Sequence, residues 1–341
     1  MFGNFEQGPI RPPSEANSLL IRVTRNCPWN KCLFCPVYKN EKFSTREVAE
    51  VKSDISNMRK IIKAGKEPES VFLQDADNLV IPADDLAEII GEIKNNFGNV
   101  SRITTYARSK TAAKKSVEEL KKLSQAGLSR VHVGLETGHD PLLEYVKKGV
   151  TSAQQIEAGL KIKEAGLNLS EYVILGLGGK DLSRQHAIDT AKVLSEIDPD
   201  FIRVRTLGVR DGVPLVEKVR QNELTLANDL EILNELRLFL EHLDVKNSYF
   251  YSDHILNLLE EVSGKLPEDK PDMIRVIDDF FNLPEKDKKN FMVGRRLGAY
   301  RFLHDLMDQG LYEKVERAVK EIEEKGKKPE ELICDYGGRY I

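Results

Sequence analysis

The sequence lacks the features of a secreted or membrane-spanning protein. Only four of its 341 residues are cysteine, and it begins Met1-Phe2-Gly3-Asn4, without the basic and apolar segment of a secretory signal. Apolar runs such as 172–177 are far shorter than the roughly 20 residues that cross a bilayer. We therefore expect a soluble, cytoplasmic protein whose thiols stay reduced.

The sequence also lacks an excess of charge of one sign. Charged residues make up 31% of the chain, and the net charge is −4. No global basic field indicates nucleic acid as an obligatory partner, although a local basic patch stays open.

Three of the four cysteines lie within nine residues, directly after the apolar run 19–23. Cys27, Cys32 and Cys35 follow the spacing C-x4-C-x2-C. A structural zinc site closes with four protein ligands, so three thiolates favour an iron–sulfur cluster with one iron open for chemistry. Two alternatives remain: a zinc site completed by Cys334 or a histidine, and three unrelated cysteines in a core loop.

Short β-branched runs alternate with segments of helical period, which predicts repeated βα units around a parallel sheet. The predicted strands are 19–24, 71–73, 102–106, 131–135, 169–175 and 201–205. The predicted helices are 45–64, with a capping box from Ser44 and Glu47, then 84–97, 116–125, two on either side of 149–151, and 182–196. Six such units form an open barrel or a doubly wound sheet, with ligands at the carboxyl ends of the strands.

From about Leu224 onward, helical patterns dominate, with breaks at 264–267 and 283–286. The predicted domains are an N-terminal segment, 1–18; a barrel, 19–215; and a mainly helical C-terminal region that covers the barrel, 216–341. Because eighteen residues precede Leu19, we expect no separate N-terminal module.

The cysteine loop, with Phe34 directly before its last cysteine, resembles that of the radical S-adenosylmethionine (SAM) superfamily. Two further segments, Gly-Leu-Glu-Thr-Gly-His-Asp at 134–140 and Lys-Lys-Gly-Val-Thr at 147–151, extend the resemblance over residues 19–207. It implies an α/β fold, a partial (β/α)6 TIM-like barrel. It also implies a 4Fe-4S cluster whose open iron is chelated by SAM, which is cleaved to methionine and a 5′-deoxyadenosyl radical. The commonest family spacing is C-x3-C-x2-C, and a bulge in the loop can absorb the extra residue here.

The resemblance implies roles for particular residues. Cys27, Cys32 and Cys35 ligate the cluster as thiolates. The implied SAM-binding residues are Phe34 against the adenine; Gln74, Asp75 and Ala76 at the methionine ammonium; Arg108 and Arg205 at its carboxylate; Glu136 at the ribose or ammonium; and Leu175, Gly176 and Leu207 around the glycine stretch 176–179.

Ordinary structural roles compete with several of these assignments. Phe34 can be a simple loop anchor, and the arginines can form surface ion pairs. The acidic residues after the second strand can cap a helix. Trp29, the single tryptophan, is interpreted as a shield for the loop, and His132 as a core histidine.

Only Cys334 lies outside the cysteine loop, so we expect no second cluster held by cysteines. A single cluster favours an enzyme that abstracts a hydrogen atom from a small or medium organic substrate. Turnover would require exclusion of oxygen and a low-potential electron donor such as flavodoxin or ferredoxin. The alternatives are a radical SAM enzyme that modifies a macromolecule such as RNA or protein, and a non-catalytic iron–sulfur or zinc sensor. The sequence does not identify the substrate, because selectivity resides in side chains that follow no general code.

Overall fold

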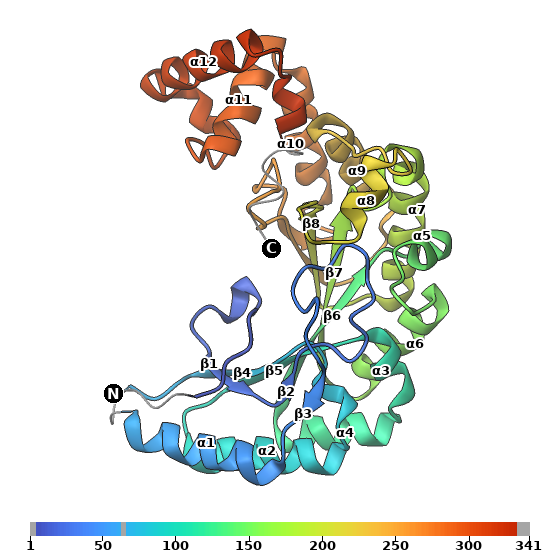
Figure 1. Cartoon of the computed structure of the whole chain (residues 1–341), viewed down its shortest axis with the longest axis vertical. Helices are drawn as coiled ribbons and strands as arrows, with labels where there is room; N and C mark the ends of the chain where they lie inside the picture. The colour runs from blue at the N-terminus through green and yellow to red at the C-terminus, as the bar shows by residue number, and fades with distance from the viewer. Residues whose placement is uncertain (1–4, 63–65, 333–341) are drawn as a thin grey trace. The chain divides into compact units, whose positions relative to one another are not determined.

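The computed structural model describes residues 5–62 and 66–332, so Cys334 lies outside the described residues. The chain forms two compact units (Figure 1). Unit 1 runs to Leu135 and includes Gly149–Glu171, whereas unit 2 comprises Glu136–Lys148 and the chain from Tyr172 onward. The fold is α/β with a parallel central sheet, as the sequence predicts.

Unit 1 contains parallel strands in the order β1-β4-β5-β6, followed by the first half of β7. Their bounds are β1 (Leu19–Arg22), β4 (Ser70–Gln74), β5 (Arg102–Ala107), β6 (Leu128–Glu136) and β7 (Asn168–Leu175). Leu20 pairs with Phe72, and Phe72 pairs with Thr104, so these residues share one face of the sheet. The short strands β2 (Thr24–Arg25) and β3 (Ser44–Thr45) pair on either side of the cysteine loop.

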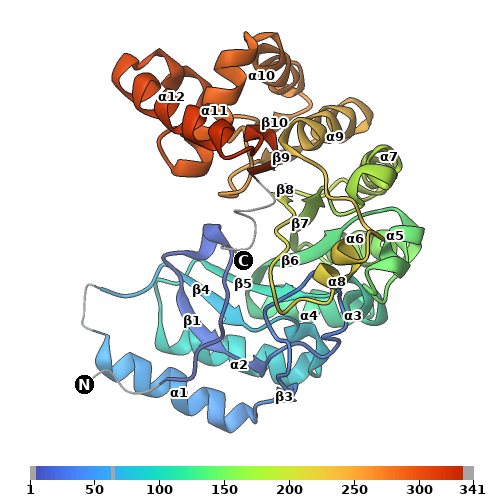
Figure 2. The same ribbon diagram turned by 45° about the horizontal axis from the view of Figure 1, so that its top comes forward.

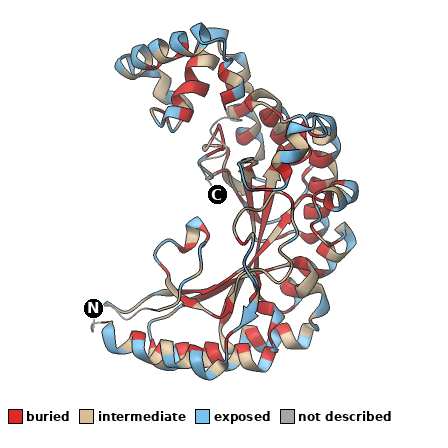
Figure 3. Ribbon diagram, in the orientation of Figure 1, coloured by how far each residue is buried: buried red, intermediate tan, exposed pale blue. Residues whose placement is uncertain are grey.

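The helices of unit 1 bury one apolar face each. They are α1 (Val48–Ile61), α2 (Ala83–Asn96), α3 (Ser109–Lys114), α4 (Val117–Ala126) and α6 (Ser152–Glu164). In α2, the buried residues Leu86, Ile89, Ile90 and Ile93 recur at helical spacing. Figure 3 shows buried residues along the strands and exposed residues on the outer sides of α1 and α2.

Unit 2 continues from the second half of β7 through β8 (Phe201–Thr206), β9 (Ser248–Tyr251) and β10 (Gly264–Leu266) (Figure 2). Strand β9 is parallel to β8, and β10 is antiparallel to β9. The helices are α5 (Asp140–Tyr145), α7 (Gly179–Ile197), α8 (Leu215–Arg220), α9 (Asp229–His242), α10 (Lys270–Asn282), α11 (Glu285–Leu297) and α12 (Gln309–Glu324).

The structure differs from the sequence predictions in local details. Ser44 lies in β3, and α1 begins after Glu47 without a side-chain cap, so the predicted capping box is wrong. The pairing of Ser44 with Arg25 takes precedence over local capping. The sequence analysis also missed β9 and β10, because each is short and lies between long helical segments.

His132 is a core residue, as expected from its position in a strand. It is fully buried in unit 1, where its ring contacts those of Phe72 and Tyr106 edge-on. Its Nε2 lies 3.4 Å from a carboxylate oxygen of Glu15, whose pKa is lowered to about 2 despite burial, by hydrogen bonds from His132 and Ser18.

Within residues 5–62 and 66–332, no helix is both long and apolar enough to span a membrane.

Candidate functional site

The cysteine loop belongs to unit 1 and connects β2 to β3. Cys27, Cys32 and Cys35 are all half-buried. Asn26 and Asn30 have φ angles of 67° and 46°, in the left-handed region that asparagine tolerates better than most residues. The Asn30 N–H donates to Cys27 Sγ at 3.4 Å. Asn40, near the end of the loop, has a φ of 67° as well, so the loop turns at three asparagines, and the Asn30 N–H points at a candidate cluster ligand.

Hydrogen bonds to the backbone hold the loop in shape. The Asn30 side-chain amide donates to the Tyr38 carbonyl. Lys39 Nζ donates to the carbonyl oxygens of Asn30 and Cys32 at 3.0 and 2.9 Å. An ammonium group of the loop itself thus fixes the backbone around Cys32.

Asp75 anchors the loop to the end of β4. Its fully buried carboxylate accepts from Arg22 Nε at 2.8 Å, from the Asn26 N–H at 3.1 Å and from the Tyr38 hydroxyl at 2.8 Å. Burial beside this carboxylate raises the pKa of Tyr38, which stays a donor. Asp75 thus connects both ends of the cysteine loop to the sheet, a role that sequence reasoning did not assign.

The neighbours of Asp75 have different environments. The Gln74 side-chain amide exchanges hydrogen bonds with the backbone of Gly8, at 3.0 and 3.2 Å, and also donates to the Ile10 carbonyl. Ala76 is only half-buried. Asp77 precedes a short 3-10 helix but its side chain makes no capping hydrogen bond, so the capping alternative is wrong for Asp77. Because the Gln74 and Asp75 side chains have partners already, Ala76 is the most accessible of the three predicted ammonium-binding residues.

Trp29 is surrounded by cations. Lys31 Nζ lies 4.8 Å from the centre of the Trp29 ring, and the Arg108 guanidinium lies at 5.2 Å. The structure therefore brings Arg108, a predicted SAM-binding residue, to the cysteine loop. The Trp29 ring also packs against Gly149, where an added Cβ would lie 2.4 Å from Trp29 Cζ2.

We expect Gly149→Ala to destabilise the protein by about 2 to 5 kcal/mol. Gly149 has a φ of 74°, where a side chain costs about 1 to 2 kcal/mol, and overpacking against Trp29 adds about 1 to 3 kcal/mol. The measurement is the free energy of unfolding in urea. Gly326→Ala is the matched control, because Gly326 has a φ of 71° and open space at its Cβ position. Equal losses in the two variants would show that the contact with Trp29 is unimportant.

Phe34 lies in unit 1 and is half-buried, whereas Glu136, Leu175, Gly176, Arg205 and Leu207 lie in unit 2. Glu136 ends β6 with a φ of 66°, and its carboxylate pairs with Lys148 Nζ at 2.7 Å. The two side chains are 13% and 11% exposed, so the pair is largely buried. Lys148 belongs to the segment 147–151 that carries the resemblance, yet sequence reasoning did not identify it as a partner of Glu136.

The glycine stretch after β7 is held by a buried carboxylate. Gly176 has a φ of 75°, and its N–H donates to Glu235 Oε1 at 2.7 Å. The Leu207 N–H donates to the Leu175 carbonyl at 2.9 Å, so Leu175, Gly176 and Leu207 lie close together. The Arg205 guanidinium lies 4.7 Å from the centre of the Tyr172 ring.

Glu235 has two further polar neighbours. Its Oε2 accepts from the Ser183 hydroxyl at 2.6 Å, and its Oε1 lies 3.5 Å from His186 Nε2. Burial raises the pKa of Glu235 to about 7 and lowers that of His186 to about 4. A sequence signal existed, because Glu235 lies between Ile232 and Phe239 on the apolar face of α9.

We expect the stability of the protein to fall with rising pH through Glu235. The native pKa of about 7 exceeds the unfolded value of 4.5, so between these values the native state holds a proton that the unfolded chain has lost. From about pH 5 to about pH 8, the free energy of unfolding of the wild type should therefore fall by about 2 to 3 kcal/mol more than that of Glu235→Gln. Urea titrations at each pH measure the difference, and parallel pH profiles would contradict it.

The segment 134–140 packs against α7. The Gly138 N–H donates to the Thr190 hydroxyl at 2.9 Å, and an added Cβ at Gly138 would lie 2.6 Å from the Asp189 carbonyl. His139 Nδ1 lies 2.7 Å from an Asp189 carboxylate oxygen. Close packing and a charged hydrogen bond therefore account for the glycine and histidine of this segment.

The cysteine loop fits an iron–sulfur cluster. Its donor set is three thiolates, the ligands that such clusters take from proteins. No three His, Cys, Asp or Glu side chains among the described residues converge on one metal ion. A cluster does not require such convergence, because it binds each thiolate at a different iron.

A parallel α/β sheet with a three-cysteine loop after its first strand defines a class of iron–sulfur enzymes. A model of the Radical SAM superfamily matches residues 21–194, about half of the chain. The chain belongs to the radical SAM superfamily, whose members are enzymes that use a 4Fe-4S cluster and SAM.

Similar proteins are distant. An uncharacterised protein of Methanocaldococcus jannaschii is 24% identical over 65% of this chain and 70% of its own length. A tRNA-2-methylthio-N(6)-dimethylallyladenosine synthase of Dehalococcoides mccartyi is 23% identical over 65% of this chain and 54% of its own. Coproporphyrinogen III oxidase from Escherichia coli, a radical SAM enzyme, matches with a TM-score of 0.51 and 17% identity over 66% of this chain and 52% of its own. The chain thus spans about half the length of the last two.

Proposed function

We propose that this chain cleaves SAM reductively and uses the resulting 5′-deoxyadenosyl radical to abstract hydrogen from a small or medium organic substrate. The observation that carries the proposal is the cysteine loop, which presents three thiolates and is tied to the sheet by the buried carboxylate of Asp75. Burying the polar groups that hold this loop costs free energy. That cost is expected for a loop that positions a functional group and not for a loop that only connects two strands.

Cys27, Cys32 and Cys35 would hold the cluster, which when bound supplies an electron and an open iron for SAM. Phe34, half-buried beside Cys35, would pack against the adenine. Ala76 would accept from the methionine ammonium through its carbonyl, and Arg108 would pair with the carboxylate.

The family motifs imply further SAM-binding residues. Glu136 would bind the ribose hydroxyls or the ammonium, and Lys148 would orient its carboxylate. Leu175, Gly176 and Leu207 would contact the adenine, with Glu235 positioning the Gly176 backbone. We also propose a flavodoxin- or ferredoxin-like electron donor.

A polar aromatic cluster in unit 2 supports a small organic substrate. The Arg203 guanidinium lies 4.5 Å from the Tyr251 ring centre and pairs with Asp253. Arg205 similarly covers Tyr172. Aromatic faces with a few fixed charges are typical of sites for small polar molecules.

A second candidate function is modification of a macromolecule. The relative from Dehalococcoides mccartyi is named for a reaction on tRNA and matches 65% of this chain. For an RNA substrate, affinity would fall steeply with salt.

Deuterium transfer distinguishes the two candidates. A fully deuterated cell extract is separated by ultrafiltration into small molecules and macromolecules, and each fraction is incubated with the reconstituted protein, SAM and dithionite. We expect mass spectrometry to find deuterated 5′-deoxyadenosine with the small-molecule fraction only. Deuterium from the macromolecular fraction alone would support the second candidate and overturn the first. The Cys32→Ala variant is the control for enzyme-independent exchange.

A further inference from the structure

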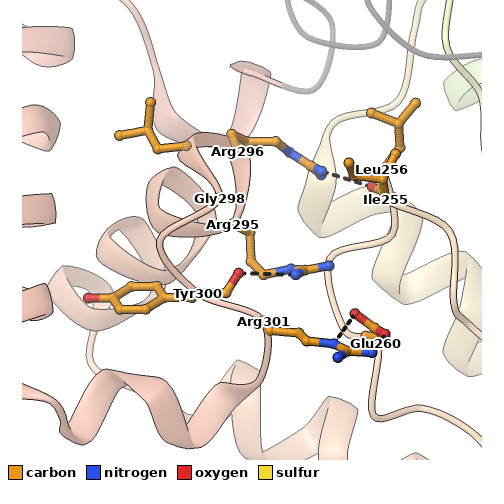
Figure 4. Close-up of a pocket in the computed structure, with 9 residues that line it drawn as sticks. Ile255, Leu256, Glu260, Arg295, Arg296, Gly298, Tyr300 and Arg301 are labelled. Atoms are coloured by element: carbon orange, nitrogen blue, oxygen red, sulfur yellow. Dashed lines mark hydrogen bonds and ion pairs between the residues drawn. The ribbon is translucent and has the colours of Figure 1, made fainter.

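Unit 2 contains a cavity of about 340 Å³ between residues 255–260 and the C-terminal end of α11 (Figure 4). Its lining is of two kinds. Apolar surface comes from Ile255, Leu256 and Leu297, whereas charge comes from Arg295, Arg296, Arg301 and Glu260. The volume falls within the range of sites for small ligands, about 300 to 1,000 Å³.

Two of the three arginines have carboxylate partners. Arg296 is buried and pairs with the buried carboxylate of Asp229. Arg301 pairs with Glu260, as the dashed line in Figure 4 shows. These two cations are therefore neutralised within the unit.

Arg295 has a different environment. Its guanidinium donates to the carbonyl oxygens of Leu258 at 3.0 Å, Tyr300 at 3.1 Å and Asn257 at 2.9 Å. Within residues 5–62 and 66–332, no carboxylate forms an ion pair with it. Burial lowers its pKa, which reflects the cost of desolvating this charge. Carbonyl oxygens satisfy its N–H groups and fix its orientation, while Glu260 and Glu261 act on its charge only from beyond ion-pair distance.

The rim of the cavity exposes apolar surface. Ile255 is 56% exposed and Leu297 is 49% exposed. Gly298, the turn residue after α11, has a φ of 71° and open space around its Cβ position, so it adds no side chain at the mouth. A ligand that covered the two rim residues would gain about 25 cal/mol for each Å² of apolar surface removed from water.

We propose that this cavity binds a small organic monoanion, a carboxylate with an aliphatic or aromatic body. The carboxylate would pair with Arg295, and the body would cover Ile255 and Leu297. A guanidinium that contacts only carbonyl oxygens matches one carboxylate, and the apolar rim distinguishes such a ligand from inorganic anions. Its lining residues belong neither to the cysteine loop nor to the glycine stretch, so the site goes beyond the proposed function.

Equilibrium dialysis of the full chain with radiolabelled octanoate tests the proposal. We expect one saturable site for which octylamine and acetate do not compete, because the first lacks the anion and the second lacks the body. Leu297→Trp should weaken binding at least about tenfold by filling the mouth, and Arg295→Gln should do the same by removing the charge. Because Leu297 is half-exposed, its variant is expected to fold even if Arg295→Gln does not.

Leu160→Trp is the matched control, because Leu160 is 48% exposed and lies in α6, outside the cavity. It should leave octanoate binding unchanged. The proposal would be overturned by the absence of saturable binding, by octylamine competing as well as octanoate, or by equal affinities in Leu297→Trp and the wild type.

Discussion

Cys32→Ala will lose its iron–sulfur cluster and all formation of 5′-deoxyadenosine. Cys32 contributes one of only three thiolates on the loop, and no other described cysteine can replace it. Anaerobic reconstitution should load the wild type with about four irons and matching sulfide, with broad visible absorbance that the variant lacks. Cys27→Ala and Cys35→Ala should behave in the same way.

Cys334→Ala is the control for this experiment. If three loop thiolates suffice, this variant keeps the iron content and activity of the wild type. A zinc site completed by Cys334 would instead lose its metal in all four variants, and such a result would contradict the radical SAM function. Cluster retention in Cys32→Ala would show that the ligands are wrongly assigned.

Asp75→Ala should be the most destabilising substitution around the loop, by about 3 to 5 kcal/mol, because it leaves the largely buried Arg22 guanidinium with only the more exposed Glu6 as a carboxylate partner and removes a buried acceptor. Asn26 and Tyr38 lose their shared acceptor as well, so the loop should hold the cluster poorly. Urea unfolding of the apoprotein and iron content after reconstitution measure the two effects.

Glu50→Ala is the control for a simple ion-pair loss nearby. Glu50 is 44% exposed and pairs with Arg25 and Arg46, so its removal should cost no more than about 1 kcal/mol and leave iron content unchanged. If Asp75→Ala is no less stable than Glu50→Ala and keeps its cluster, Asp75 is no anchor. If Asp75→Ala instead has normal stability but binds SAM more weakly, Asp75 binds the methionine ammonium, as the resemblance implies.

The sequence predicts the parallel sheet well because its strands are buried on the helix-facing side. Runs such as 131–135 are both apolar and β-branched, and all six predicted strands match observed ones. Strands β9 and β10 could not be identified in this way. β9, Ser248–Tyr251, has only four residues, of which Ser248 and Phe250 are buried, so its pairing with β8 and β10 defines it.

The candidate site was predictable where residues adjacent in sequence act together, as in the cysteine loop. It was not predictable where support comes from distant segments. Glu235 and Gly176 are hydrogen-bonded although 59 positions separate them in the sequence, and 53 positions separate Arg22 from Asp75. Periodicity can mark Glu235 as an acid on an apolar face, but only the fold identifies the N–H group that it accepts.

Cleavage of SAM by the reconstituted protein tests the central claim most directly. The full chain is loaded with iron and sulfide without oxygen, reduced with dithionite and incubated with SAM, and the products are separated by chromatography. We predict equal amounts of 5′-deoxyadenosine and methionine, both absent without the cluster. A chain that takes up zinc in place of a cluster, or a loaded chain that leaves SAM intact, would contradict the function proposed for this protein.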